Sequence, residues 1–250
     1  MLSKNKIKYI RSLELKKNRK EAQVFLAEGH KLVDDLLGYF PCQLIVGTSQ
    51  WLHTHTKIQA EEIIEVSEEE LSRASLLKTP QEVLAIFKQP QYSYNPTIAR
   101  EQLCLALDDI QDPGNLGTIV RIADWFGIKH IFCSTGTADI YNPKTVQATM
   151  GAIARVQLHY CNLTELFTKL ANIPIFGTFL DGENIYTQKL STYGIIVMGN
   201  EGKGISPEVS NFINKRLLIP NFPQGYKTSE SLNVAVATAI TCSEFRRRNL

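Results

Sequence analysis

The sequence has few of the features that mark metal sites, disulfide scaffolds or membrane proteins. Its 250 residues include five cysteines, and no two of them form a CxxC pair, which argues against a zinc site or a disulfide framework. No apolar run approaches the length of a membrane span, and the start of the chain lacks the apolar core of a signal peptide. His53 and His55 lack neighbouring cysteines or acids, so we interpret them as surface residues and expect no metal. A cytoplasmic, reducing environment fits this composition.

Net charge is also small, at +2, but its distribution is uneven. Residues 1–20 carry eight cations against the single acid Glu14. Clustered cations displace counterions from nucleic acid, so this block is a candidate RNA-binding surface, although a solvated helix face explains it equally well. The candidate phosphate contacts are Lys4, Lys8, Arg11, Lys16, Lys17, Arg19 and Lys20.

The first ninety residues alternate between helical and strand patterns. Strands are expected at 43–46, 62–66 and 83–87, with an acidic helix start at 67–70 between the last two. This alternation predicts a small α/β domain over residues 1–92. A segment rich in proline and polar residues follows, so we place a linker at 93–100 and a second domain at 101–250.

The second domain contains short, nearly continuous apolar runs separated by helical patterns. Such runs are typical of strands buried on both faces of a parallel sheet. They lie at 103–107, 130–133, 173–177, 194–198 and 216–219. Asn142-Pro143 and Ser206-Pro207 are good helix starts, because a capping side chain precedes a proline at the first helical position. The predicted fold class is therefore α/β.

Three segments of this domain run from a strand through a loop into a helix, at 107–121, 196–206 and 219–236. Such loops open at the carboxyl ends of parallel strands, where backbone amides can hold a ligand. At about 100° per residue, Arg121 lies nearly opposite the apolar stripe of its helix. Glu201 stands among three glycines after a buried strand. A solvated arginine and a tight turn with an exposed glutamate are the alternative interpretations.

The third segment ends in an unusual helix. Residues 232–240 are small or apolar on nearly every face, which predicts burial on all sides and a second subunit that covers part of the helix. Ser229, Ser231 and Asn233 stand at its N-terminus, where free amides and the helix dipole favour an anion. Simple capping by Ser229 or Ser231 is the alternative.

In order and position, the three segments resemble motifs 1, 2 and 3 of the SpoU (TrmH) family of RNA ribose 2′-O-methyltransferases. Residues 24–30 and 78–86 resemble the small L30e-like substrate-binding domain that many members carry, and residues 149–155 match a further family stretch. The resemblance implies a deep trefoil knot in the parallel-sheet domain, S-adenosyl-L-methionine as cofactor and a homodimer packed through the knotted domain.

The resemblance also assigns roles by motif. It implies catalytic residues at Asn115, Arg121, Glu201, Ser231 and Asn233. It implies cofactor contacts, largely through backbone atoms, at Thr178, Phe179, Leu180, Gly199, Asn200, Gly202, Ile219 and Leu232. The loop at 221–228 is longer than the family usually has, which affects the expected shape of that loop.

The implied reaction is methyl transfer to a ribose 2′-hydroxyl of structured RNA, with a lean to ribosomal RNA. A guanidinium has a pKa above about 12, so we expect Arg121 to bind a phosphate and stabilise developing negative charge rather than act as a base. The alternatives are a noncatalytic RNA-binding knotted dimer, a transfer-RNA enzyme and a guanine-N1 methyltransferase. The Ser-Leu-Asn sequence at 231–233 argues against the last.

Overall fold

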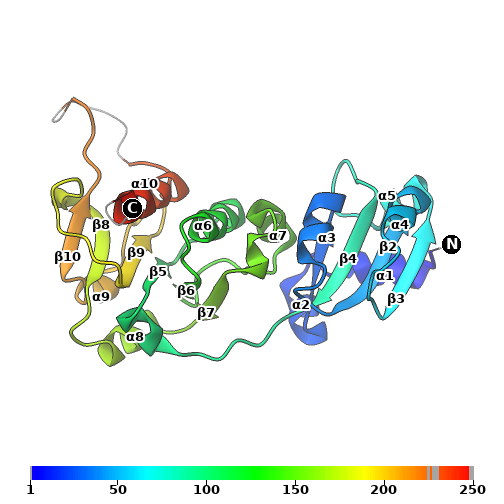
Figure 1. Ribbon diagram of the computed structural model, residues 1–250, viewed down its shortest axis with the longest axis horizontal. Helices are drawn as coiled ribbons and strands as arrows, with labels where there is room; N and C mark the ends of the chain where they lie inside the picture. Colours follow the sequence, from blue (N-terminus) through cyan, green and yellow to red (C-terminus); the bar gives the residue numbers. More distant parts are fainter. Residues whose placement is uncertain (1, 224–225, 227–230, 248–250) are drawn as a thin grey trace. The chain divides into compact units, whose positions relative to one another are not determined.

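The computed structural model describes residues 2–223, 226 and 231–247 (Figure 1). The chain packs as two compact units, each described here by itself. The first comprises residues up to Gln91 together with the segment Asp139–Ala154, and the second comprises Tyr92–Ala138 and the chain from Arg155 onward. The first unit therefore includes a segment that sequence analysis assigned to the second domain.

The first unit is built on a four-stranded sheet of order β1-β4-β2-β3. β2 and β3 are parallel, whereas β4 is antiparallel to both β1 and β2. The strands are β1 (Val24–Glu28), β2 (Cys42–Thr48), β3 (Glu62–Val66) and β4 (Val83–Lys88). The helices are α1 (Lys4–Ser12), α2 (Lys16–Ala22), α3 (His30–Leu36), α4 (Ser49–Thr54), α5 (Glu68–Ala74) and α7 (Pro143–Thr149), with a 3₁₀ turn η2 (Ala152–Ala154). The predicted strands at 43–46, 62–66 and 83–87 are confirmed.

Local sequence signals explain where these helices begin. The Ser67 hydroxyl accepts a hydrogen bond from the Glu70 amide, and the Glu70 carboxylate accepts one from the Ser67 amide, both at 3.2 Å. This reciprocal capping satisfies two amides that the first turn leaves unpaired. The Asn142 side chain likewise accepts from the Lys144 amide at 2.9 Å and caps α7. Both predicted helix starts are confirmed.

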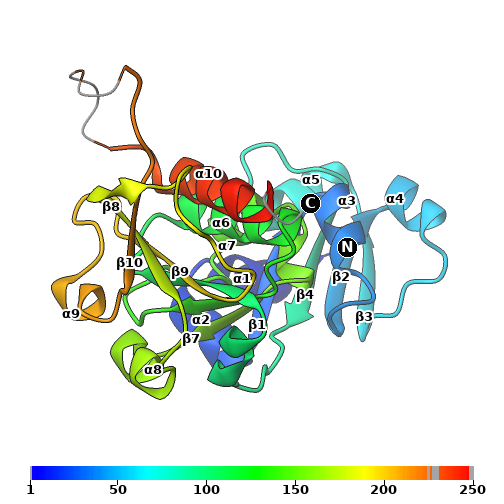
Figure 2. The same cartoon turned by 60° about the vertical axis from the view of Figure 1, so that its left-hand side comes forward.

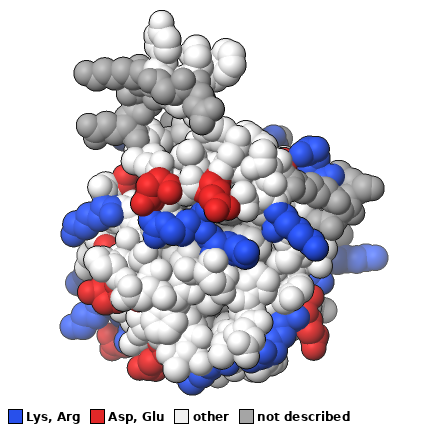
Figure 3. All heavy atoms as spheres, turned by 90° about the vertical axis from the view of Figure 1, so that its left-hand side faces the viewer, with Lys and Arg blue, Asp and Glu red and all other residues white. Residues whose placement is uncertain are grey.

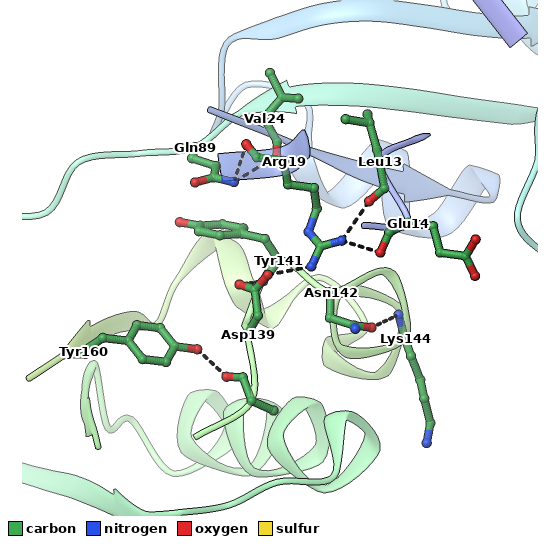
Figure 4. A network of polar contacts seen from close by, with 11 residues as sticks. Leu13, Glu14, Arg19, Val24, Gln89, Asp139, Tyr141, Asn142, Lys144 and Tyr160 are labelled. Atoms are coloured by element: carbon green, nitrogen blue, oxygen red, sulfur yellow. Dashed lines mark hydrogen bonds and ion pairs between the residues drawn. The ribbon is translucent and has the colours of Figure 1, made fainter. Parts of the chain in front are cut away.

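A buried ion pair holds the Asp139–Ala154 segment in the first unit (Figure 4). Arg19 is 1% exposed, and its guanidinium donates to Asp139 Oδ2 at 2.6 Å. The same side chain donates to the carbonyls of Leu13 and Glu14, at 2.7 Å each. Nearby, the ring of Tyr141 stacks on Phe25 with centroids 5.3 Å apart. Arg19 is thus a structural residue, which corrects its assignment to the RNA-binding cations.

The second unit is built on a six-stranded sheet of order β10-β8-β9-β5-β6-β7, in which every pair is parallel. The strands are β5 (Leu103–Asp108), β6 (His130–Cys133), β7 (Gln157–Tyr160), β8 (Ile175–Asn184), β9 (Gly194–Gly199) and β10 (Lys215–Leu218). The helices are η1 (Pro96–Arg100), α6 (Pro113–Trp125), α8 (Leu163–Lys169), α9 (Pro207–Ser210) and α10 (Val234–Arg247). The parallel α/β architecture is confirmed, and β7 is an edge strand that the sequence did not reveal.

Helices α6 and α10 lie side by side in the same direction (Figures 1 and 2). Near their starts Asn233 hydrogen-bonds Asn115, and near their ends Arg246 Nε donates to the carbonyl of Phe126 at 2.7 Å. One face of α10 is buried, but Val236 is 48% exposed, as Trp125 of α6 is 84%. Within one chain, α10 is therefore not buried on all sides as the sequence predicted.

Across the described ranges no helix is long and apolar enough to cross a membrane. The five cysteines are free. Burial raises the pKa of the Cys104 and Cys242 thiols to about 12, so neither is a thiolate near neutral pH. The same part of the chain holds no cluster of three or more His, Cys, Asp or Glu that could bind a metal.

Candidate functional site

The loops that leave β5 and β9 are tied together at the carboxyl edge of the second sheet. Asp108 is the last residue of β5 and is 6% exposed, and its Oδ2 accepts from the Ser206 amide at 2.7 Å. Asn200 follows β9, and its Nδ2 donates to the carbonyl of Asp109 at 2.7 Å. β5 and β9 are neighbouring parallel strands, so these two side chains fix the relative positions of the loops that continue them.

The loop after β9 is a tight backbone turn. Asn200 and Gly204 exchange two backbone hydrogen bonds of 2.9 Å, and Asn200 Oδ1 accepts from the amides of Gly202 and Lys203. A Cβ at Gly199 would lie 2.3 Å from the carbonyl carbon of Gly204, so only glycine fits there. A Cβ at Gly202 would meet its nearest atom at 3.7 Å, an ordinary contact. The Asn200 side chain therefore shapes this loop, because it holds the amides of Gly202 and Lys203 in place.

Three side chains from the three predicted segments form one hydrogen-bonded line. Asn233 Nδ2 donates to Asn115 Oδ1 at 3.0 Å, and Asn115 Nδ2 donates to Glu201 Oε1 at 3.1 Å. Residues separated by 86 and 118 positions in sequence therefore meet. Each end of the Asn115 amide has one partner, so its orientation is fixed. We call Asn233, Asn115 and Glu201 the amide line.

Asp112 and Asn233 are the residues whose side chains cap helices α6 and α10. Asp112 caps α6, because its Oδ1 accepts from the Asn115 amide at 2.8 Å, which leaves the Asn115 side chain free for the amide line. Asn233 caps α10, since its Oδ1 accepts from the amides of Ala235 and Val236. Ser231 is exposed and precedes this cap, and Ser229 lies outside the described residues.

Arg121 lies on the exposed face of α6, as its position opposite the apolar stripe predicted. Within the described ranges the Arg121 side chain has no hydrogen-bond or ion-pair partner. The structure thus brings together three of the predicted catalytic residues, and it leaves the Arg121 guanidinium available to an incoming anion. A cation that the fold does not neutralise is suited to bind a phosphate group.

The residues expected to contact a cofactor lie in or after β8, β9 and β10, three adjacent strands. Leu180 is 75% exposed and Leu232 is 48% exposed, whereas Ile219 is half-buried. Exposed apolar side chains suit a ligand that has an apolar ring face, such as an adenosyl group. The assignment of these residues to the cofactor remains a prediction.

Some residues that build this edge had only a weak signal in the sequence. Asp109 has a φ of 62°, and its amide donates to the Ser134 hydroxyl at 2.9 Å. A Cβ at Gly136 would lie 2.2 Å from Asp109 Oδ1, so the loop after β6 passes close to that carboxylate. In the sequence, the only indication was that two acids, Asp108 and Asp109, follow an apolar run. Their partners Ser206 and Ser134 are distant in sequence.

Comparison with known proteins gives consistent matches over both units. The profile of the SpoU rRNA Methylase family matches residues 102–243, and that of the MRM3-like substrate binding domain matches residues 4–85. The 23S rRNA (guanosine(2553)-2′-O)-methyltransferase RlmP of Bacillus subtilis is 30% identical over 249 residues, which cover 96% of each chain.

Solved structures agree with these matches. A TrmH-family protein from Porphyromonas gingivalis is 45% identical, with a TM-score of 0.90 over 99% of both chains. An rRNA methyltransferase from Sinorhizobium meliloti with bound AdoMet is 31% identical, with a TM-score of 0.84 over 100% of this chain and 97% of that one.

Proposed function

This chain belongs to the SpoU rRNA methylase family, and from that membership we propose that it transfers a methyl group from S-adenosyl-L-methionine to a ribose 2′-hydroxyl of ribosomal RNA. The amide line is the observation that carries the proposal, because it joins the three segments whose polar residues the reaction needs. RlmP and the Sinorhizobium meliloti protein, whose names specify rRNA methylation, align over nearly the whole chain.

The chemistry requires orientation more than activation. S-adenosyl-L-methionine supplies, when bound, a methyl carbon already activated by a sulfonium whose leaving thioether is neutral. The bond between sulfur and methyl breaks as the bond between the 2′-oxygen and methyl forms. Holding two reactants in line can lower the barrier by about 7 to 11 kcal/mol at best. We assign the positioning of the target nucleotide to the amide line.

Arg121 is proposed to bind the RNA phosphate beside the target ribose. Its guanidinium has no partner within the described chain, and it presents a rigid fork that matches two phosphate oxygens. The same charge stabilises negative charge that develops on the 2′-oxygen. The proton then passes to that phosphate, to Ser231 or to water, since a guanidinium does not readily give up a proton and take another.

The proposed RNA surface of the first unit is smaller than the sequence suggested. Lys6 pairs with Glu62 at 2.5 Å, and Arg11 donates to the carbonyls of Arg73 and Ser75. Arg19 is buried and Arg11 is exposed but bonded, so the exposed candidate cations that make no described side-chain hydrogen bond or ion pair are Lys4, Lys8, Lys16, Lys17 and Lys20. All five lie within residues 4–85, the range that matches a substrate binding domain.

We further propose a cytoplasmic homodimer that packs through α6 and α10, in the knotted topology that family membership implies. Trp125 is 84% exposed and Val236 is 48% exposed on these adjacent helices. Large apolar side chains on an exposed helix face are a common mark of an interface. Sedimentation of the wild type and a Val236→Lys variant tests the assignment, because a charge at the proposed interface should produce monomers.

The function is tested by incubating the protein and methyl-labelled cofactor with total RNA from cells that lack the protein, followed by separation of ribosomal from transfer RNA and nucleoside analysis of each. A labelled 2′-O-methylnucleoside supports the proposal. Label in a base indicates the guanine-N1 class, and label in transfer RNA alone indicates the other substrate class. Calorimetry that shows no cofactor binding would indicate a noncatalytic RNA-binding protein. Arg121→Lys should retain cofactor affinity and lose turnover at every pH, and wild-type turnover would refute the bidentate role.

A further inference from the structure

Strand β8 leaves its ladder with β10 and then returns to it. Arg216 of β10 pairs with Gly177 of β8, but the next residue, Leu217, pairs with Glu183. Residues 178–182 therefore project from the sheet, and we call them the 178–182 excursion. It contains Thr178, Phe179 and Leu180, three of the eight residues that the family resemblance assigns to cofactor contacts.

Arg216 lies at the point where the register breaks, and its side chain contacts the excursion twice. The guanidinium carbon is 3.5 Å from the ring centroid of Phe179, and Nη2 donates to Asp181 Oδ1 at 2.6 Å. Nη1 also donates to the Ser210 hydroxyl at 3.3 Å. The hydrogen bond from Arg216 lowers the pKa of the Asp181 carboxyl, which therefore stays ionised at neutral pH. One side chain thus links the middle of the excursion to β10 and α9.

The two ends of the excursion are fixed by close packing. A Cβ at Gly177 would lie 2.4 Å from Ile213 Cδ1, and a Cβ at Gly182 would lie 2.5 Å from the carbonyl carbon of Leu217. Between these ends Phe179 is half-buried, Leu180 is 75% exposed and Asp181 is exposed. Phe179 also packs against the core of the second unit, whereas Leu180 and Asp181 are exposed, so the contacts from Arg216 add to that packing and restrict the exposed part of the excursion.

We propose that Arg216 is a positioning residue that holds the 178–182 excursion in the shape that accepts the cofactor. This inference rests on the proposed function and on the cofactor contacts that the family resemblance implies for these loops. The stack on Phe179 needs a planar cation, and the bond to Asp181 needs a donor at its edge, so arginine meets both demands where lysine meets one. Arg216 acts through Phe179 and Asp181, without contact to the reacting groups.

The surrounding surface offers a second use for this cation. Arg216, Lys215 and Lys189 line a depression of about 330 Å³ together with Asp181 and Glu183. Figure 3 shows Lys and Arg side chains in a row across this face of the molecule, with acidic side chains beside them. If Arg216 bound RNA directly, its loss would weaken RNA binding and not cofactor binding. The experiment must separate these two effects.

The test is calorimetry with S-adenosyl-L-methionine on the full chain, with Arg216→Ala, Arg216→Lys and a Lys215→Ala control. Lys215 precedes Arg216 on β10 and lines the same depression, but within the described chain its side chain makes no hydrogen bond or ion pair with the excursion. Exposed stacks and ion pairs of this kind predict about a five- to tenfold loss of cofactor affinity in Arg216→Ala. Arg216→Lys should lie between that variant and the wild type, and Lys215→Ala should match the wild type.

Kinetics supply a measurement that general destabilisation would not reproduce. Arg216→Ala should raise KM for the cofactor, while kcat at saturating cofactor and KM for RNA stay at wild-type values. Unchanged cofactor affinity in Arg216→Ala, or an equal loss in Lys215→Ala, would overturn the proposal, as would an effect confined to KM for RNA. A wild-type protein that fails to bind the cofactor would refute the proposed function itself, which is a different result.

Discussion

Replacement of Asp139 by asparagine should destabilise the first unit strongly. Arg19 and Asp139 side chains are 2% and 15% exposed, so the pair is largely out of water. Asp139 Oδ1 accepts from the Tyr141 amide at 3.0 Å, and an asparagine side chain can keep that bond because its amide also has an oxygen. The NH₂ group of the asparagine would then face the guanidinium, donor against donor. Removing one partner of a buried pair costs about 3 to 5 kcal/mol.

We expect the lower end of that range, about 3 kcal/mol, because Arg19 keeps two carbonyl acceptors at 2.7 Å. Arg19→Met should cost less, about 2 kcal/mol, since Asp139 can then hydrate while two carbonyls lose a donor. The double variant should be more stable than the sum of the two changes predicts, by at least about 1 kcal/mol.

Urea unfolding followed by tryptophan fluorescence measures these changes. The chain has two tryptophans, and Trp51 in the first unit is 3% exposed, whereas Trp125 in the second is 84% exposed. A Trp125→Phe background therefore reports the first unit alone. Glu69→Gln is the matched control, because the Arg73–Glu69 pair is 63% and 77% exposed and should contribute below about 0.5 kcal/mol. A cost below about 1 kcal/mol for Asp139→Asn, or strict additivity, would refute the reasoning.

Four further predictions follow from the described contacts. Asn115→Asp places a carboxylate 3.1 Å from Glu201 Oε1, so kcat should fall about 100-fold with cofactor affinity retained, as kinetics and calorimetry would show. Gly199→Ala should abolish cofactor binding by calorimetry, whereas Gly202→Ala should bind normally, given nearest contacts of 2.3 and 3.7 Å. Replacing Lys16, Lys17 and Lys20 with glutamine should reduce the slope of log affinity for RNA against log salt by about 2, with Arg19→Met unchanged. Burial and His130 lower the pKa of His159 from its ordinary 6.5 to about 4. Below pH 6.5 the unfolded chain therefore takes up a proton that the folded chain does not, so the free energy of unfolding is highest above pH 6.5 and falls toward pH 4 by up to about 1.4 kcal/mol per pH unit. This pH dependence of the urea midpoint should be absent in His159→Gln.

Strands buried on both faces were predictable because their sequences are nearly continuous apolar runs. β5, β6 and β9 match the predicted ranges to within one residue at each end. β7 was missed because Gln157–Tyr160 is an edge strand with one fully buried side chain, His159. The excursion of β8 beyond residue 177 was missed for a different reason. Its shape depends on Leu217 and Arg216, which come forty residues later.

The exposure of Arg121 followed from helical periodicity alone, since a helix fixes the angle between residues. The amide line did not, because nothing local in the sequence relates Asn115 to Glu201 or Asn233. Only the resemblance to the family placed those residues in one site, and in the structure they are joined by hydrogen bonds. The resemblance also assigned Gly199 and Gly202 to the same cofactor loop. The space around them differs, because a side chain would clash at Gly199 but not at Gly202.

Charge patterns were the least informative part of the sequence, and Arg19 and Arg216 show why. A run of cations gives the number of charges on a segment but not their partners. Arg19 stands among exposed lysines on α2, yet its partner Asp139 is 120 residues away. Arg216 follows an exposed lysine on β10, yet it stacks on Phe179 and pairs with Asp181. In both cases the residue is an arginine that bonds several acceptors at once, whereas its lysine neighbours remain exposed. Within a basic segment of this protein, the arginines are therefore the first residues to test for structural roles, and the lysines for contacts with RNA.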